Sequence, residues 1–327
     1  MKREHVFDPD AAAEGDGIYG LPFSPDDAKV VIIPVPFEAT TSYGGGTSRG
    51  PAAVLEASKQ VDLFDRDTGR PYEAGIAMLP LPKKIVRWNA EAKKLGRKRV
   101  TAVNRISGAV NDWVYEQTRS FLEEGKMPVV LGGDHSVPFG AMRAYAEKYP
   151  GMGVLHLDAH ADLRDTYEGF TYSHASIFHN VMTRLPKISK LVQVGVRDVG
   201  QAESRMIQES KGRIVTFFDS DLAALKEDGA PFGRLADAIV AELPDDVYLS
   251  WDIDGLDPTL CPGTGTPVPG GLSWNEAIGL LRALKRSGKR IVGLDLCEVS
   301  PGEDEWDANV GARLLYKMIG FALLTQR

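Results

Sequence analysis

Cysteine is scarce in this 327-residue chain, since only Cys261 and Cys297 occur. Two thiols allow at most one disulfide bond, which excludes a disulfide-based scaffold, and a chain with both thiols reduced is the simpler expectation. Residues 1–17 are polar and lack the apolar core of a signal peptide. The most apolar early run, 30–37, is too short to cross a membrane and contains two prolines. These absences predict a cytoplasmic protein with no membrane partner.

An excess of basic residues is also absent. The chain has 38 Lys and Arg against 45 Asp and Glu, a net charge of −7. This balance argues against nucleic acid or an anionic membrane as a partner, because both attract positive surfaces. A negatively charged pocket would instead attract a small cation. Internal repeats, low-complexity tracts and coiled-coil heptads are not found either.

Two segments rich in carboxylates stand out against this background. Each follows an apolar, strand-like run, the first being Asp158-Ala159-His160-Ala161-Asp162 and the second Asp252-Ile253-Asp254. Residues two apart in an extended strand point the same way, so each segment presents its polar side chains together. Four carboxylates repel one another unless a cation lies among them, and hard divalent ions accept mixed oxygen and nitrogen ligands.

A third segment, Gly132-Gly133-Asp134-His135-Ser136, also follows a short apolar run. Taken alone it is typical of a turn and helix cap. Together, the three segments offer six candidate metal ligands, with four Asp charges to balance two divalent cations: His135, Asp158, His160, Asp162, Asp252 and Asp254. A calcium-binding hand is disfavoured, because a strand precedes Asp252 and the required downstream Glu is missing.

These three motifs resemble the signatures of the ureohydrolases, the arginase and agmatinase superfamily. The likeness extends from about Val30 to the C-terminus and includes an early Gly46-Thr47-Ser48-Arg49-Gly50-Pro51 turn and a late Glu298-Val299-Ser300-Pro301. The resemblance implies two metal ions, Mn²⁺ with Ni²⁺ as the alternative. His135, Asp158, Asp162 and Asp252 would hold one ion, and Asp158, His160, Asp252 and Asp254 the other. Asp158 and Asp252 would bridge them.

The resemblance also assigns roles outside the metal ligands. Glu298 matches the glutamate that binds the guanidinium group, and an ordinary structural ion pair is its alternative. His174 matches the histidine that shuttles protons to the leaving amine, and its alternative is an ordinary packed histidine. His156, inside the strand that leads to Asp158, is interpreted as structural. The family implies a homotrimer or homohexamer.

The expected fold is α/β, a single three-layer domain with a mostly parallel sheet and helices on both faces. Strand-like runs alternate with helical stretches; the strands are expected near 30–36, 127–131, 153–157, 191–196, 213–218, 247–251 and 290–296, and the helices at 138–149, 231–243 and 273–286. The candidate ligands must converge on one pocket, which favours one catalytic domain, 29–327, after an N-terminal arm, 1–28.

The substrate is predicted from departures from the family pattern. The loop 163–172 is aromatic and acidic where arginases carry Ser and Asn, which disfavours arginine. Apolar bulk from Tyr167, Phe170, Tyr172 and Trp306 is expected to close the pocket around a small cation such as free guanidine.

Several alternatives stay open beside that closed pocket. Asp165, Glu168 or Glu303 would accept the distal ammonium of agmatine. A guanidinobutyrase or related amidinohydrolase, a two-metal phosphatase or peptidase, and a non-catalytic binding protein with the same fold are the others.

Overall fold

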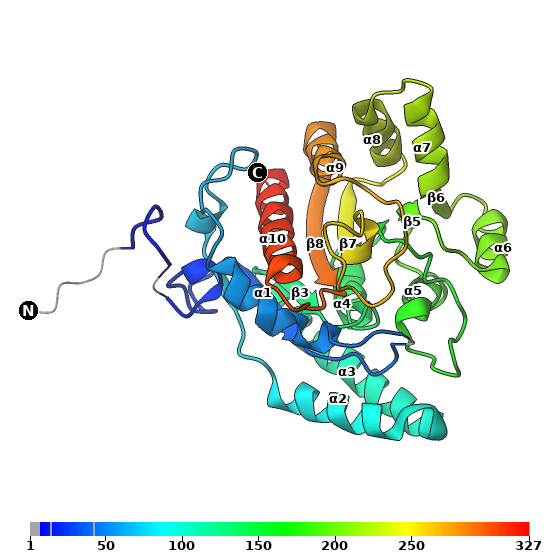
Figure 1. The fold of residues 1–327 in the computed structure, drawn as a ribbon, viewed down its shortest axis with the longest axis horizontal. Helices are drawn as coiled ribbons and strands as arrows, with labels where there is room; N and C mark the ends of the chain where they lie inside the picture. Colours follow the sequence, from blue (N-terminus) through cyan, green and yellow to red (C-terminus); the bar gives the residue numbers. More distant parts are fainter. Residues whose placement is uncertain (1–6, 14, 42, 327) are drawn as a thin grey trace, which may run out of the picture.

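The computed structural model describes residues 7–13, 15–41 and 43–326. Its centre is an eight-stranded sheet in which all the paired strands are parallel, with the order β2-β1-β3-β8-β7-β4-β5-β6 (Figure 1). The strands are β1 (Val30–Val35), β2 (Ile76–Met78), β3 (Met127–Gly132), β4 (Gly153–Leu157), β5 (Lys190–Val196), β6 (Ile214–Phe218), β7 (Asp246–Asp252) and β8 (Arg290–Cys297).

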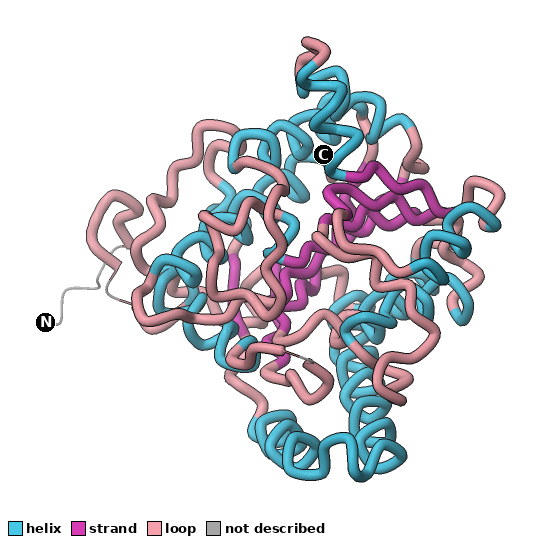
Figure 2. The backbone as a smooth tube through the Cα atoms, turned by 45° about the vertical axis from the view of Figure 1, so that its right-hand side comes forward, coloured by secondary structure: helices cyan, strands magenta, loops and turns pink. Residues whose placement is uncertain are grey.

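Helices cover both faces of this sheet, and Figure 2 shows the strands enclosed between them. One apolar cluster joins the sheet to α1 (Gly50–Ser58), α7 (Asp219–Glu227), α8 (Phe232–Ala241), α9 (Trp274–Ser287) and α10 (Trp306–Thr325). Two further clusters join the opposite face to α2 (Lys83–Leu95), α3 (Val100–Glu123), α4 (Phe139–Lys148), α5 (Ile177–Arg184) and α6 (Gln201–Glu209). The prediction of a three-layer α/β domain is confirmed.

The strands form where the sequence places short runs of Val, Ile and Leu. All six residues of β1 are buried, as expected for a strand covered on both faces of a parallel sheet. Each of the seven expected strands is present, and α4, α8 and α9 lie where helices were predicted. The three-residue edge strand β2 was not predicted, because so short a run shows no periodicity.

Part of the predicted N-terminal arm belongs to the packed core. Ile18, Tyr19 and Leu21 are buried, and the Tyr19 hydroxyl donates a hydrogen bond to the carbonyl oxygen of Ala312 in α10 at 3.2 Å. Residues 1–6 lie outside the described residues. The boundary between an arm and a domain at residue 28 stays a prediction.

The sheet order places the candidate ligands at one edge. The strands β3, β8, β7 and β4 are neighbours at the centre of the sheet, and all point the same way. Their carboxyl ends therefore open onto one shared crevice, the usual place for a ligand in an open α/β sheet.

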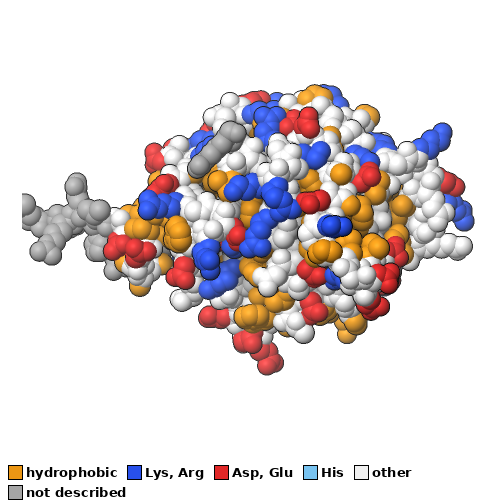
Figure 3. All heavy atoms as spheres, turned by 90° about the horizontal axis from the view of Figure 1, so that it is seen from above, with side chains coloured by type: hydrophobic (Ala, Val, Ile, Leu, Met, Phe, Trp, Pro, Cys, Tyr) orange, Lys and Arg blue, Asp and Glu red, His pale blue; other side chains and the backbone are white. Residues whose placement is uncertain are grey.

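The outer surface is of mixed character. Figure 3 shows basic, acidic and hydrophobic side chains interspersed on one face of the molecule. Among the described helices, none combines the length and the hydropathy needed to cross a membrane.

Candidate functional site

The six predicted ligands gather at the carboxyl ends of β3, β4 and β7. Five of them are almost fully buried, and the side chain of His160 is 24% exposed. They divide into two groups of side chains that meet at Asp158.

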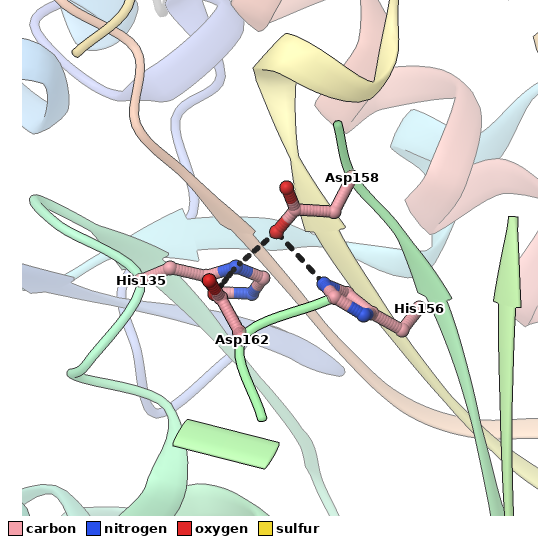
Figure 4. A group of neighbouring side chains, drawn as sticks. All are labelled: His135, His156, Asp158 and Asp162. Carbon is pink, nitrogen blue, oxygen red and sulfur yellow. Dashed lines mark hydrogen bonds and ion pairs between the residues drawn. The ribbon is translucent and has the colours of Figure 1, made fainter. Parts of the chain in front are cut away.

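The first group surrounds the Nδ1 atom of His135. This nitrogen lies 3.1 Å from Oδ2 of Asp158, 3.5 Å from Oδ2 of Asp162 and 3.6 Å from Oδ2 of Asp252. Figure 4 shows the imidazole of His135 facing the carboxylates of Asp158 and Asp162. Nδ1 of His135 thus has three carboxylate oxygens near it, and one nitrogen with three oxygens is a donor set that suits a divalent cation.

The second group uses the other oxygen of Asp158. Its Oδ1 atom lies 3.2 Å from Nδ1 of His160, and the same nitrogen lies 3.2 Å from Oδ2 of Asp254. Asp158 therefore offers one oxygen to each group, which is the arrangement required of a carboxylate between two cations.

The pKa values of the clustered side chains favour the binding of cations. Burial, followed by the charge of Asp158, raises the pKa of Asp162 to about 7 and also raises the pKa of Asp254. Burial and then the charge of Asp254 raise the pKa of Asp252 well above its usual value. Burial opposes protonation of His160, yet the carboxylates of Asp254 and Asp158 raise its pKa. Crowded carboxylates that would otherwise take up protons are stabilised in their charged form by divalent cations.

Glu298 lies beside the first group, directly after β8. Its Oε1 atom accepts a hydrogen bond from the backbone N–H of His135 at 3.0 Å, whereas Oε2 is buried and has no partner among the described residues. Burial, and then the charge of Asp134, raise the pKa of Glu298 well above its usual value. A Cβ atom on Gly265 would lie 3.0 Å from Oε2, so glycine leaves space in front of this oxygen. An unpaired buried carboxylate oxygen is a ready acceptor for a cationic N–H donor.

Two acidic residues of the site have left-handed backbone conformations. The φ angle is +53° at Asp162 and +63° at Glu298. Residues other than glycine rarely adopt this backbone region, because it costs on the order of 1 kcal/mol or more. The surrounding structure must therefore hold both residues in place.

Comparison with known proteins shows which family has this fold and this sequence. A model of the arginase family matches residues 28–320. The chain belongs to the arginase family. It is 36% identical over 298 residues to an N(1)-aminopropylagmatine ureohydrolase of Thermus thermophilus, covering 90% of each chain, and 31% identical over 291 residues to an agmatinase of Bacillus anthracis, covering 86% and 87%. The crystal structure of the agmatine ureohydrolase of Thermoplasma volcanium superimposes with a TM-score of 0.76 at 25% identity, covering 94% of each chain.

This arginase-family protein is accordingly a ureohydrolase, a hydrolase that acts on C–N bonds of guanidino compounds. Members of the family depend on two metal ions, and the residues present fit that requirement. The predicted family and the predicted reaction class are confirmed.

His174 lies close to the predicted metal ligands His160 and Asp162. Its backbone N–H donates to Oγ1 of Thr40 at 3.2 Å, and its ring meets the ring of Tyr167 edge-on at 5.8 Å between centroids. Burial, then the positive charge of His160, lowers the pKa of His174 to about 4. The imidazole is therefore neutral at pH 7 and has a lone pair to accept a proton.

A cavity of about 340 Å³ leads from the cluster toward solvent. Its wall includes His160, Asp162 and His174, and beyond them the residues Tyr43, Arg164, Tyr167, Ala175, Asp198, Glu203, Thr266, Pro267 and Val268. Sequence reasoning did not find Tyr43, Arg164 or Asp198. Asp198 comes shortly after the predicted strand 191–196, so the rule applied to the metal ligands would have pointed to it.

Of the four bulky residues expected to close the pocket, one lies in the wall of this cavity. Tyr167 does line the cavity, but Phe170 is buried in the apolar cluster that includes residues of α2 and α3. Tyr172 packs on Phe139, and Trp306 is 46% exposed with its indole N–H donating to the carbonyl oxygen of Thr259. None of these three residues is among those that line the cavity.

The acidic residues predicted to bind a distal ammonium do not line the cavity either. Asp165 lies 3.7 Å from the imidazole of His179, and Glu168 forms an ion pair with Arg97 at 2.6 Å. Glu303 is exposed in the turn before α10. Asp198, which was not predicted, does line the cavity.

Proposed function

We propose that this ureohydrolase releases urea from a small guanidino compound that carries a second cationic group, as agmatine does. The unpaired buried oxygen of Glu298 beside the histidine and carboxylate cluster is the observation that carries the proposal. A guanidinium group can donate two parallel N–H bonds to a carboxylate, and its charge offsets the cost of burying that carboxylate.

The cluster residues are proposed to hold two ions. His135, Asp162 and Asp252 would hold one and His160, Asp254 and Asp252 the other, with Asp158 and Asp252 shared. When bound, the pair of ions lowers the pKa of water to about 7 and so supplies a nucleophile at neutral pH. We propose Mn²⁺ as the metal and Ni²⁺ as the alternative, because the ligand set suits both ions. Elemental analysis of the purified protein distinguishes them.

His174 is proposed to move the proton. The neutral imidazole accepts a proton at the cluster side of the cavity and donates it to the nitrogen that leaves with the tail of the substrate. Glu298 keeps the guanidinium carbon facing the cluster throughout, since its carboxylate is held by the backbone N–H of His135.

The cavity wall supports a substrate with a cationic tail. Arg164 stacks on Tyr167 at 4.7 Å from the ring centroid and lies 3.6 Å from a carboxylate oxygen of Glu203, which partly neutralises it. The carboxylate of Asp198 is exposed, lines the same cavity, and forms no hydrogen bond or ion pair with the described residues. A distal ammonium would find its counter-charge there, whereas free guanidine leaves most of the cavity unfilled.

A tail that ends in a carboxylate is the second candidate, because Arg164 also lines the cavity. The deciding measurement is kcat/KM for urea release from agmatine, 4-guanidinobutanoate, free guanidine and arginine. We expect agmatine to be the best of the four. A preference for 4-guanidinobutanoate would favour a guanidinobutyrase, and a preference for guanidine would favour a closed site.

The variant Asp198→Asn tests the contact directly. An exposed ion pair contributes about 1 kcal/mol, so kcat/KM for agmatine should fall about fivefold while the value for guanidine stays unchanged. Asp165→Asn is the matched control, since Asp165 lies outside the cavity. Equal losses for agmatine and guanidine would contradict a tail-binding role of Asp198.

The assembly and the remaining alternatives are tested on the same preparation. We propose a homotrimer or homohexamer, as the family resemblance implies, and light scattering measures the mass. Absence of urea release from every guanidino compound with two ions bound would favour the non-catalytic alternative.

A further inference from the structure

His156 lies inside β4, two residues before Asp158, and is completely buried. Its side chain belongs to the same close cluster as His135, Asp158 and Asp162, so by proximity alone it counts as a metal ligand. Figure 4 shows its ring pointing at Asp158 from the side opposite His135. The hydrogen bonds of the two histidines show that their roles differ.

Both ring nitrogens of His156 are engaged. Nε2 lies 2.8 Å from Oδ2 of Asp158, and Nδ1 lies 3.0 Å from the amide nitrogen of Gln193. The Gln193 amide is itself oriented, because its nitrogen donates to the carbonyl oxygen of Ala161 at 2.7 Å and its oxygen accepts from the Thr216 hydroxyl at 2.9 Å. Since the Gln193 nitrogen donates, Nδ1 of His156 must accept, and the ring proton is on Nε2.

This proton assignment makes His156 a donor to the carboxylate. The Nε2–H group points at Oδ2 of Asp158 and has no lone pair for a cation, and the lone pair on Nδ1 is already used. His135 is the reverse case. Its Nδ1 faces three carboxylates, and its Nε2 lies 2.9 Å from the hydroxyl of Ser250, which donates onward to Asp295 at 3.0 Å.

The strand register builds this chain of hydrogen bonds. His156 of β4 is paired with Gln193 of β5, and Gln193 is paired with Thr216 of β6. Partners in register on neighbouring strands present their side chains on the same face, about 5 Å apart. Three polar residues therefore cross the buried sheet in a row and end at Asp158.

We propose that His156 is a positioning residue, which with Gln193 and Thr216 behind it holds the Asp158 carboxylate so that its two oxygens face different cations. This inference rests on the proposed sharing of Asp158 between two ions. Groups that orient a metal ligand from behind typically change metal affinity by about 10- to 100-fold when removed.

Three variants test the role through metal binding. His156→Leu removes the donor, Gln193→Leu removes the group that fixes the ring proton, and His156→Gln retains an amide N–H near the place of Nε2. The measurements are Mn²⁺ binding isotherms and the low-temperature electron paramagnetic resonance spectrum, in which two bridged Mn²⁺ ions give an exchange-coupled signal. Leu155→Ala is the matched control, because Leu155 is buried on the same strand but faces the other side of the sheet.

We expect His156→Leu to weaken Mn²⁺ binding by about 10-fold or more and to lose the coupled signal, and Gln193→Leu to weaken binding in the same direction. His156→Gln should bind Mn²⁺ within about threefold of the unmodified protein, and Leu155→Ala should lose thermal stability alone. Unchanged binding in His156→Leu would refute the positioning role. Equal loss of metal in His156→Gln and His156→Leu would make His156 a ligand. Two coupled ions in a protein that releases no urea would contradict the proposed function but not this inference.

Discussion

Replacing Glu298 with Gln should make this ureohydrolase more stable and much less active. Burial raises the pKa of Glu298, so the folded state retains the proton more tightly than the unfolded chain does. Stability from this residue is therefore present at low pH and is lost as the pH rises from the ordinary glutamate value toward the raised one. Gln has the same shape and no charge, so the variant should not lose this stability as the pH rises.

The size of both effects follows from the contacts of Glu298. One of its oxygens is buried without a partner among the described residues; Gln keeps a polar atom there but removes the charge, whose burial we take to cost about 1–3 kcal/mol. Metal-free Glu298→Gln at pH 7.5 should therefore melt on the order of 1–4 °C higher. Replacing charge-assisted bonds to a guanidinium by neutral ones should cost about 2–4 kcal/mol, or roughly 30- to 700-fold in kcat/KM.

Differential scanning calorimetry and urea release measure the two effects. Glu203→Gln is the matched control for stability, because both oxygens of this buried glutamate accept backbone N–H bonds, from Leu163 and Gly200. That variant should melt lower. A Glu298→Gln protein that melts lower than the unmodified protein, or retains its activity within about threefold, would refute the reasoning.

Other consequences concern the proposed metal ligands and the proposed proton carrier. Asp252→Asn should lose both ions and all turnover, because it removes the charge that we propose two cations share. Asp257→Asn should keep both ions, because the carboxylate of Asp257 accepts hydrogen bonds from Thr259 in a turn. Two ions per chain in Asp252→Asn would remove the bridging role of Asp252. His174→Ala should lower kcat by about 10²-fold with its metal content unchanged, whereas His160→Ala should lose metal. Because the pKa of His174 is lowered to about 4, the folded state binds fewer protons below pH 6.5 and stability falls as the pH drops toward 4. His174→Asn should therefore reduce the difference in melting temperature between pH 7 and pH 5, and an unchanged difference would contradict the low pKa.

The regular elements were predictable because strand and helix periods are local properties of the sequence. The polar residues at strand ends were predictable for a related reason. In a parallel sheet all carboxyl ends lie on one edge, and the neighbouring strands β3, β8, β7 and β4 then bring His135, Asp158 and Asp252 together. The order of the strands and the partner of each Asp158 oxygen required coordinates.

The cavity wall was less accessible to sequence reasoning. Trp306 and Phe170 were expected there because they are close in sequence to site residues, yet their side chains pack elsewhere. The direction of a loop side chain depends on long-range contacts, such as the ion pair between Glu38 and Lys93 beneath the loop that carries Tyr43. Such contacts leave no periodic pattern in the sequence.

The left-handed backbone at Glu298 and Asp162 has a consequence for laboratory evolution. Glycine adopts such angles without a steric cost, and it would also remove a buried carboxylate at each position. A screen that rewards heat resistance alone should therefore accumulate glycine, or a neutral residue, in the catalytic machinery itself. Libraries for this enzyme need a selection for urea release in every round, because stability and turnover make opposite demands on the same two codons.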